Sequence, residues 1–415
     1  MNLPRLYNIA KENLFDSSLV LMSWLVPKDR DGYVFSASTG KTYSGNPKFL
    51  FEYMRTKHRC VFVVNDKPLV MNLRQRGIKA NYTYSFASWW SVVRARSLVV
   101  DNGLRGPFAY GILARFGRFN ILQTWHGTGI KGTIKHHGMN ETIRKWLNKS
   151  FSTILASSPP HKEVLQQYFE NDNVVITGSP KNDIFFRKSL PSGYSYLDKY
   201  DSVILYAPTF RDDMWFHPFD SAFLNRLNEW LKENNYIFLI KRHPNDPYFV
   251  VGAGYENIRD ITKEVEDVQE LLLFVDILIT DYSSISTDFS LTGRPIIFYV
   301  YDNEEYTKIR PHFFGLERLP GPFVYDQDSL LDHLKDMSWS KSLGYKMDYM
   351  KSRDFWNTYQ DGKSCKRVEA LLDKRSVRKM NDVKCPICGS ANVRTKRRLI
   401  KHWCRDCCNW FVQGD

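Results

Sequence analysis

The chain lacks an apolar run long enough to cross a membrane, since a spanning helix needs roughly 18 consecutive apolar residues. Its best candidate, residues 14–27, is shorter and contains Asp16. The N-terminus also lacks the basic start, apolar stretch and small-residue cleavage site of a secretory signal. We therefore expect a cytoplasmic protein without a transmembrane helix.

Cysteine is scarce in most of the chain, and acidic residues are nearly absent from its tail. Of seven cysteines, only Cys60 and Cys365 lie outside residues 385–408. In a reducing compartment, such a cluster indicates metal binding instead of disulfides. Residues 374–405 contain eleven Lys or Arg and one acid, a net +10 of the formal +13. We expect this tail to meet any acidic partner.

The body of the chain has the length and composition of two folded domains. It accounts for most of 415 residues with 43% hydrophobic and 15% aromatic content, which argues against disorder. Apolar, β-branched runs bounded by turn residues predict buried parallel strands. The first series lies at 60–66, 96–102, 119–125, 151–157 and 173–178, and the second at 202–208, 236–244, 276–284 and 295–300.

Two series of this kind predict an α/β fold with two Rossmann-like, doubly wound domains that face a cleft, the architecture of GT-B glycosyltransferases. The polar, turn-rich segment near 183–201 separates them. We place the first domain at 1–184 and the second at 185–375, the latter with closing helices. A small cysteine module follows at 383–413.

Polar motifs follow the predicted strands, where open α/β sheets bind their ligands. Arg, Lys and His in these motifs can neutralise a diphosphate and the charge that develops during its transfer. Ser283 and Ser284 are expected to begin a helix and to hold phosphate oxygens with the helix N–H groups. His126 has the side chain of a general base for an acceptor hydroxyl.

Together these motifs resemble the CDP-glycerol glycerophosphotransferase family, which comprises teichoic-acid primases and polymerases and related capsule polymerases. The motifs are WHGTG at 125–129, GSPKND at 178–183, YAPTFRD at 206–212, KRHP at 241–244 and ITDYSSISTDF at 279–289. A further similar segment lies at 35–54, so that the resemblance covers roughly residues 30–370.

The resemblance implies a specific reaction. An acceptor hydroxyl would attack the β-phosphorus of a CDP-activated polyol and release CMP. His126 matches the histidine proposed as the base in the family, and His243 matches a second histidine expected near the donor phosphates. Ser283 and Ser284 match the serines that hold the diphosphate. The first domain would bind the acceptor and the second the CDP donor.

Several further residues complete the predicted site. Arg211 and Lys241 enter it through their charge and position. The donor- and phosphate-binding set is Thr209, Arg211, Lys241, Asp281, Ser283 and Ser284, and the other cleft residues are Gly127, Thr128, Asn182 and Asp183. The chain has no HExxH or paired-carboxylate metal motif, and we predict no metal at the active site.

Structural alternatives remain for some of these residues. Ser283, Ser284 or Asp281 could simply cap a helix. Arg211 could form a surface ion pair with a neighbouring aspartate at 212–213. Gly129 and the GSPKND motif depart from the commoner family pattern, which leaves the acceptor and the polyol open.

The tail has the cysteine spacing of a zinc ribbon. Cys385 and Cys388 form one C-x2-C pair, Cys404 and Cys407 form a second pair, and fifteen residues separate the two pairs. This spacing suits a structural four-cysteine zinc site. With its basic neighbours, the module would dock to anionic lipid, anionic polymer, protein or nucleic acid.

We therefore expect transfer of a polyol phosphate to a lipid-linked or polymeric acceptor at the inner face of the membrane. Glycerol phosphate is the favoured group. One alternative is a GT-B enzyme that uses a sugar nucleotide. Another is a nucleic-acid-binding protein, which the nearly neutral body disfavours. Attachment to an anionic membrane would use residues 374–401 and 14–27. Glycerol versus ribitol, primase versus polymerase, the acceptor and the oligomeric state stay open.

Overall fold

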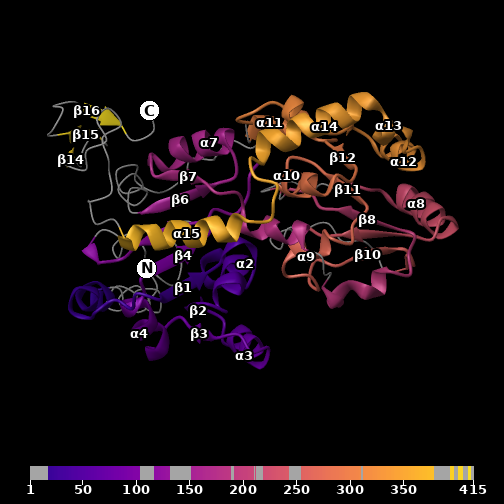
Figure 1. Cartoon of the computed structure of the whole chain (residues 1–415). Coiled ribbons are helices and arrows are strands. Elements are labelled where there is room, and N and C mark those ends of the chain that lie inside the picture. The colour runs from indigo at the N-terminus through magenta and orange to yellow at the C-terminus, as the bar shows by residue number, and fades with distance from the viewer. Residues whose placement is uncertain are drawn as a thin grey trace. The chain divides into compact units, whose positions relative to one another are not determined.

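The computed structural model shows two compact units, Met1–Cys365 and Lys366–Asp415. The residues that the structure describes are 17–102, 116–130, 151–187, 191–209, 211, 218–242, 254–309, 312–377, 393–396, 401–404 and 410–412. In the first unit the described strands form a seven-stranded and a six-stranded sheet, both parallel throughout (Figure 1). The expectation of an α/β fold with parallel sheets is confirmed.

The first sheet has the strand order β3-β2-β1-β4-β5-β6-β7. Its strands are β1 (Gly32–Ser36), β2 (Arg59–Val64), β3 (Ala80–Tyr82), β4 (Ser97–Val100), β5 (Ile121–Gln123), β6 (Thr153–Ala156) and β7 (Val174–Ile176). Its helices are α2 (Gly45–Met54), α3 (Lys67–Gln75), α4 (Phe86–Arg94) and α7 (Pro159–Phe169). The strand order reverses between β1 and β4, which is where such sheets bind ligands.

Side-chain caps begin three of these helices. Asp66, Ser85 and Ser158 accept a backbone N–H from the first turn of α3, α4 and α7. Each cap satisfies a donor that the helix leaves unpaired, which fixes where the chain turns from strand to helix.

The second sheet repeats this order as β10-β9-β8-β11-β12-β13, with its switch point between β8 and β11. Its strands are β8 (Ser202–Tyr206), β9 (Tyr236–Ile240), β10 (Ile258–Asp260), β11 (Ile277–Thr280), β12 (Ile296–Tyr299) and β13 (Phe323–Val324). Its helices are α8 (Ser221–Glu233), α9 (Val268–Leu271), α10 (Ile285–Phe289), α11 (Asn303–Ile309), α12 (Gln327–Lys335), α13 (Ser338–Lys341) and α14 (Leu343–Trp356).

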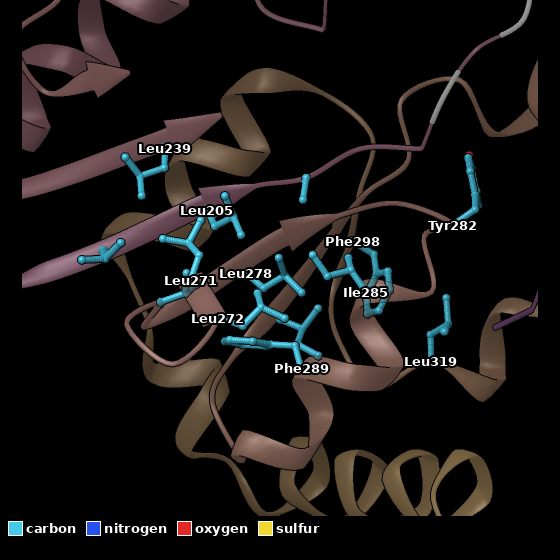
Figure 2. Close-up of a cluster of buried hydrophobic side chains, with 14 of the residues drawn as sticks. Leu205, Leu239, Leu271, Leu272, Leu278, Tyr282, Ile285, Phe289, Phe298 and Leu319 are labelled. Atoms are coloured by element: carbon cyan, nitrogen blue, oxygen red, sulfur yellow. The ribbon is translucent and has the colours of Figure 1, made fainter. Parts of the chain in front are cut away.

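An apolar core lies against one face of the second sheet (Figure 2). Leu205, Leu239 and Leu278 project from its strands toward Leu271 of α9 and Phe289 of α10, and all five side chains are fully buried. Truncating such a leucine to alanine costs about 2–5 kcal/mol. This packing fixes α10, which carries part of the predicted site, to the sheet.

In the two parallel sheets, four described strands fall outside the runs that the sequence predicted, namely β1, β3, β10 and β13. Three of them are only two or three residues long, too short for a periodic signal. β1 runs into the segment at 35–54, whose polar residues interrupt the apolar pattern that would have predicted a strand. The predicted division between 184 and 185 stays a prediction, since Met1–Cys365 forms one compact unit.

The second unit contains a small antiparallel sheet in the order β14-β15-β16. Its strands are β14 (Val393–Lys396), β15 (Lys401–Cys404) and β16 (Trp410–Val412), and helix α15 (Ser364–Val377) leads into this unit. Cys385, Cys388 and Cys407 lie outside the described residues, and the side chain of Cys404 is not described either. Among the described residues, no helix combines the length and apolar character that crossing a membrane requires.

Candidate functional site

An aspartate directly follows the inner strand at each switch point and binds the loop of the neighbouring strand. Asp101 follows β4 and accepts the backbone N–H of Ser38, just past β1, at 2.9 Å. Asp281 follows β11 and accepts the N–H of Thr209, just past β8, at 2.8 and 3.0 Å. Both aspartates are buried. The carboxyl-terminal edge of each sheet is therefore shaped by the same contact.

His126 stands on a strained turn beyond β5. The preceding residue, Trp125, has a left-handed backbone with φ of 55°, which is rare for a bulky side chain. The Nδ1 atom of His126 lies 3.4 Å from the carbonyl oxygen of Asp101. Such a contact favours the tautomer with its proton on Nδ1, so that Nε2 is the basic nitrogen. Strained backbone of this kind clusters at functional sites.

The turn after His126 lies directly against the predicted diphosphate-binding serines. A Cβ atom at Gly127 would overlap Ser284 Oγ and lie 2.9 Å from Ser284 Cβ, so a larger residue there would force Ser284 or the turn to shift. One turn further along α10, Thr287 Oγ1 donates to the carbonyl oxygen of Thr128 at 2.6 Å. The structure thus brings together the WHGTG and ITDYSSISTDF motifs, which lie more than a hundred residues apart in the sequence.

The alternative of helix capping concerns the residues just before α10. Ser284 precedes α10, but its side chain makes no capping hydrogen bond. Asp281 instead binds the Thr209 N–H and pairs with Arg211 Nη2 at 2.9 Å. Helix capping is therefore not observed for Ser284, and Asp281 binds elsewhere; phosphate binding by Ser283 and Ser284 stays a prediction.

Arg211 is buried in a cluster of charged and aromatic groups. Its guanidinium binds both carboxylate oxygens of Asp302, at 2.6 and 3.0 Å, in addition to Asp281. Tyr282 and Tyr306 lie 5.5 and 4.6 Å from it, measured to their ring centroids. Burial alone lowers the pKa of Arg211, but the two carboxylates outweigh burial and raise it above its ordinary value.

Arg211 does not form the surface ion pair that was the structural alternative, because only 10% of its side chain is exposed. Its Nη1 atom donates to the carbonyl oxygen of Thr209 at 2.7 Å, which holds the loop after β8 in place. Two aspartates offset its charge, so its described contacts organise the loop. The direct phosphate contact predicted for Arg211 stays a prediction.

Thr209 and Lys241 lie beyond β8 and β9, at the same edge of the second sheet. Within the described part of the chain, the buried Thr209 hydroxyl has no hydrogen-bond partner. The ammonium group of Lys241 donates to the carbonyl oxygen of Thr262 at 3.2 Å, and burial lowers its pKa. His243, the second predicted catalytic residue, lies outside the described residues.

Asn182 and Asp183 are buried in the 3₁₀ turn Pro180–Phe186, where they bind other parts of the chain. The Asn182 amide donates to Asp288 of α10 at 2.9 Å and accepts from Gln269 of α9 at 2.8 Å. Asp183 accepts the backbone N–H groups of Ser364 and Cys365 at 2.9 and 2.8 Å. Asn182 therefore links side chains of α9 and α10, and Asp183 fixes the backbone of Ser364 and Cys365.

A second set of contacts crosses between the sheets at the N-terminus of α2. Lys48 pairs with Asp267 at 3.4 Å and with Glu270 at 2.8 Å. Asp267 also accepts the N–H of Gly45 at 3.1 Å, and Glu266 accepts that of Tyr43 at 2.8 Å.

Sequence reasoning missed Asp101, Lys181 and Asn46. Asp101 had a usable signal, since it is a lone acid directly after the apolar strand β4, as Asp281 is after β11. Asn46 donates to the carbonyl oxygens of Thr124 and Trp125, and Lys181 donates to that of His126, all far away in the sequence. No local pattern reveals such contacts.

This chain is similar in sequence and in fold to known proteins. A sequence profile described as CDP-glycerol:poly(glycerophosphate) glycerophosphotransferase matches residues 18–374. A teichoic acid glycerol-phosphate transferase of Staphylococcus aureus is 28% identical over 375 residues, which cover 80% of this chain and 90% of that protein. A teichoic acid poly(glycerol phosphate) polymerase of Bacillus subtilis is 29% identical, over 77% of this chain and 46% of that protein.

The chain thus spans nine-tenths of the transferase but about half the length of the polymerase. Among solved structures, the wall teichoic acid polymerase TagF matches with a TM-score of 0.73 at 23% identity, over 91% of this chain and 98% of that one. This likeness concerns the fold, whereas the sequence profile covers most of the chain. The chain belongs to the CDP-glycerol:poly(glycerophosphate) glycerophosphotransferase family.

Proposed function

We propose that this chain transfers glycerol phosphate from CDP-glycerol to a hydroxyl group of a lipid-linked or polymeric acceptor and releases CMP. The observation that carries the proposal is the close approach of Gly127, next to His126, to Ser284: a methyl group added at Gly127 would overlap Ser284 Oγ and lie 2.9 Å from Ser284 Cβ. This approach puts a histidine beside the loop expected to hold a diphosphate. The name of the Staphylococcus aureus relative supports glycerol phosphate as the transferred group.

The reaction follows from the side chains at the two switch points. His126 Nε2 would accept the proton of the acceptor hydroxyl as its oxygen attacks the β-phosphorus. The bond from that phosphorus to the bridging oxygen breaks, and CMP leaves with the electron pair. Lys241, His243 and the Thr209 hydroxyl would contact the phosphate oxygens and offset the developing charge.

The proposed domain roles follow the same division. In this GT-B arrangement, residues 1–184 would hold the acceptor and residues 185–375 the CDP donor. His126 belongs to the first segment and Ser284 to the second, so the reaction would take place where the two meet.

CMP release tests the proposal directly. Purified protein would receive CDP-glycerol or CDP-ribitol together with a lipid-linked saccharide acceptor, beside the His126→Ala variant. We expect acceptor-dependent CMP release that falls by about 10²–10⁴-fold in the variant. If neither donor bound or released CMP with a panel of acceptors, phosphopolyol transfer would be refuted, and sugar nucleotides would be assayed next.

We also propose a peripheral site on the inner face of the membrane. Residues 17–25 are helical, and Leu21, Trp24 and Leu25 share one face with 62–67% of each residue exposed. Trp24 also donates its indole N–H to the carbonyl oxygen of Phe116, another exposed aromatic residue. Apolar and aromatic side chains in this arrangement suit the membrane interface.

For the tail, we propose a structural zinc ion bound by Cys385, Cys388, Cys404 and Cys407. The spacing of the two pairs supports it, as does the antiparallel sheet β14-β15-β16, whose middle strand ends at Cys404. Elemental analysis should find about one zinc per chain. Cys404→Ser should lose the metal and Cys408→Ser should keep it; zinc retained by both variants would contradict the proposed ligands.

A further inference from the structure

Two buried side chains from distant segments hold the strained turn that carries His126. Asn46, on α2, donates its amide to the carbonyl oxygens of Thr124 and Trp125 at 3.2 and 3.0 Å. The same amide accepts the backbone N–H of Lys181 at 3.1 Å. Asn46 therefore fixes the turn and the lysine together.

The side chain of Lys181 completes this support. Its ammonium group donates to the carbonyl oxygen of His126 at 3.1 Å and pairs with Asp288 at 2.6 Å. Only 11% of the Lys181 side chain and 5% of the Asp288 side chain are exposed, so water screens the pair little. Asp288 lies on α10, the helix that follows Ser284.

We propose that Asn46 and Lys181 are positioning residues for His126, and that the Lys181–Asp288 pair makes the position of His126 depend on α10. A residue held at positive φ persists only when its surroundings determine its conformation. Here the three successive carbonyl groups of residues 124–126 are all bound by these two side chains. The inference rests on the proposed role of His126 as the base.

This arrangement links the position of the proposed base, His126, to the loop that would hold the donor diphosphate. When α10 and its diphosphate-binding loop are in place, Asp288 holds the Lys181 ammonium group against the His126 carbonyl. A base must lie within hydrogen-bond reach of the proton that it removes. A displacement of about 1 Å can lower the rate about 100-fold.

The test is a pair of neutral, nearly isosteric substitutions, Lys181→Met with Asp288→Asn, which leaves no buried charge without a partner. We expect kcat to fall about 100-fold. The KM for CDP-glycerol should stay within about twofold of the wild-type value. The stoichiometry of CDP-glycerol binding, measured by calorimetry, should be unchanged, because the donor site remains folded.

The decisive readout combines this pair with His126→Ala. A positioning role acts only through His126, so the pair should cause no further loss in the His126→Ala background. An equal loss in both backgrounds, or full activity of the pair in the wild-type background, would overturn the inference. If the pair fails to fold, Asn46→Ala carries the same comparison, because it leaves no charge unpaired.

The control is the surface pair Lys232→Met with Glu256→Gln, whose side chains are 44% and 73% exposed and whose charged atoms lie 2.6 Å apart. It should leave kcat unchanged. A wild-type protein that releases no CMP would refute the proposed function itself. Loss of activity on His126→Ala alone, with the Lys181 pair fully active, would refute only the positioning role.

Discussion

Asp101 keeps a carboxyl group almost fully buried at the switch point of the first sheet. Burial raises its pKa to about 7, although the Ser38 N–H partly opposes this. The folded protein therefore binds more protons than the unfolded chain between about pH 4 and 7, and stability is lost as the pH rises through that window. Asp101→Asn should gain stability over the wild type by up to about 1.4 kcal/mol per pH unit.

Urea unfolding of both proteins from pH 4 to pH 8 measures this difference. His161 requires the comparison with the wild type, because burial lowers its pKa to about 3 and makes stability rise with pH below about 6.5. Its contribution is the same in both proteins and cancels. A constant stability difference across the range would show that Asp101 is ionised throughout.

Gly127 is a second residue whose identity is dictated by one contact. In Gly127→Ala the added methyl group would overlap Ser284 Oγ and lie 2.9 Å from Ser284 Cβ, so that Ser284 or the His126 turn would have to shift. We expect CMP release to fall about 10-fold or more. Gly193→Ala is the matched control, since nothing lies within 4 Å of its added methyl group. Full activity of Gly127→Ala would mean that the contact does not matter for catalysis.

At the level of elements, Arg211 joins the loops that follow three strands, β8, β11 and β12, through Thr209, Asp281 and Asp302. Arg211→Met would leave two buried carboxylates without their cation. We expect a loss of about 3–5 kcal/mol in the free energy of unfolding, measured with urea.

Arg226→Met gives the matched control on α8. Arg226 pairs with Asp328 at 2.6 Å, but the two side chains are 53% and 72% exposed. An exposed pair of this kind contributes less than about 1 kcal/mol. Similar losses in the two variants would show that the Arg211 cluster adds little to stability.

The elements differ in how well the sequence predicts them. Long central strands such as β8 and β9 are visible because they are continuous apolar runs buried on both faces. The prediction that polar motifs follow the strands also places His126, Thr209 and Asp281 correctly, beyond the carboxyl ends of β5, β8 and β11. Short edge strands and β1 give too weak a periodic signal.

What the sequence could not predict is which distant side chain satisfies a given backbone group. The amide of Asn46 and the backbone N–H of Lys181 are 135 residues apart and meet only because the first sheet is folded. Arg211 illustrates the same limit, since its partner Asp302 lies 91 residues away, whereas the aspartates next to it in the sequence are equally suitable by charge. Charge pairing is decided by the tertiary fold.

At the scale of the whole molecule, the proposed membrane contact can be separated from the basic tail. Replacing Trp24 and Leu25 with serine removes apolar area from the exposed face of residues 17–25 without changing the charge. We expect weaker flotation with anionic vesicles at low salt, by about 1.5–3 kcal/mol for each large side chain that becomes buried in the interface.

Leu343→Ser, at another residue that is 74% exposed, should bind the vesicles as well as the wild type does. Equal flotation of all three proteins would assign any membrane affinity to the charged tail, residues 374–401. No flotation of the wild type would end the proposal of a peripheral location.

The contacts between the two parallel sheets also limit how relatives of this chain can be recombined. The backbone of Tyr43 and Gly45 and the side chain of Lys48 find their carboxylate partners in residues 266–270. A chimera that takes one sheet from each of two relatives inherits only half of every such pair. An exchange meant to transfer donor preference must therefore carry both sides of this junction, or redesign it as a unit.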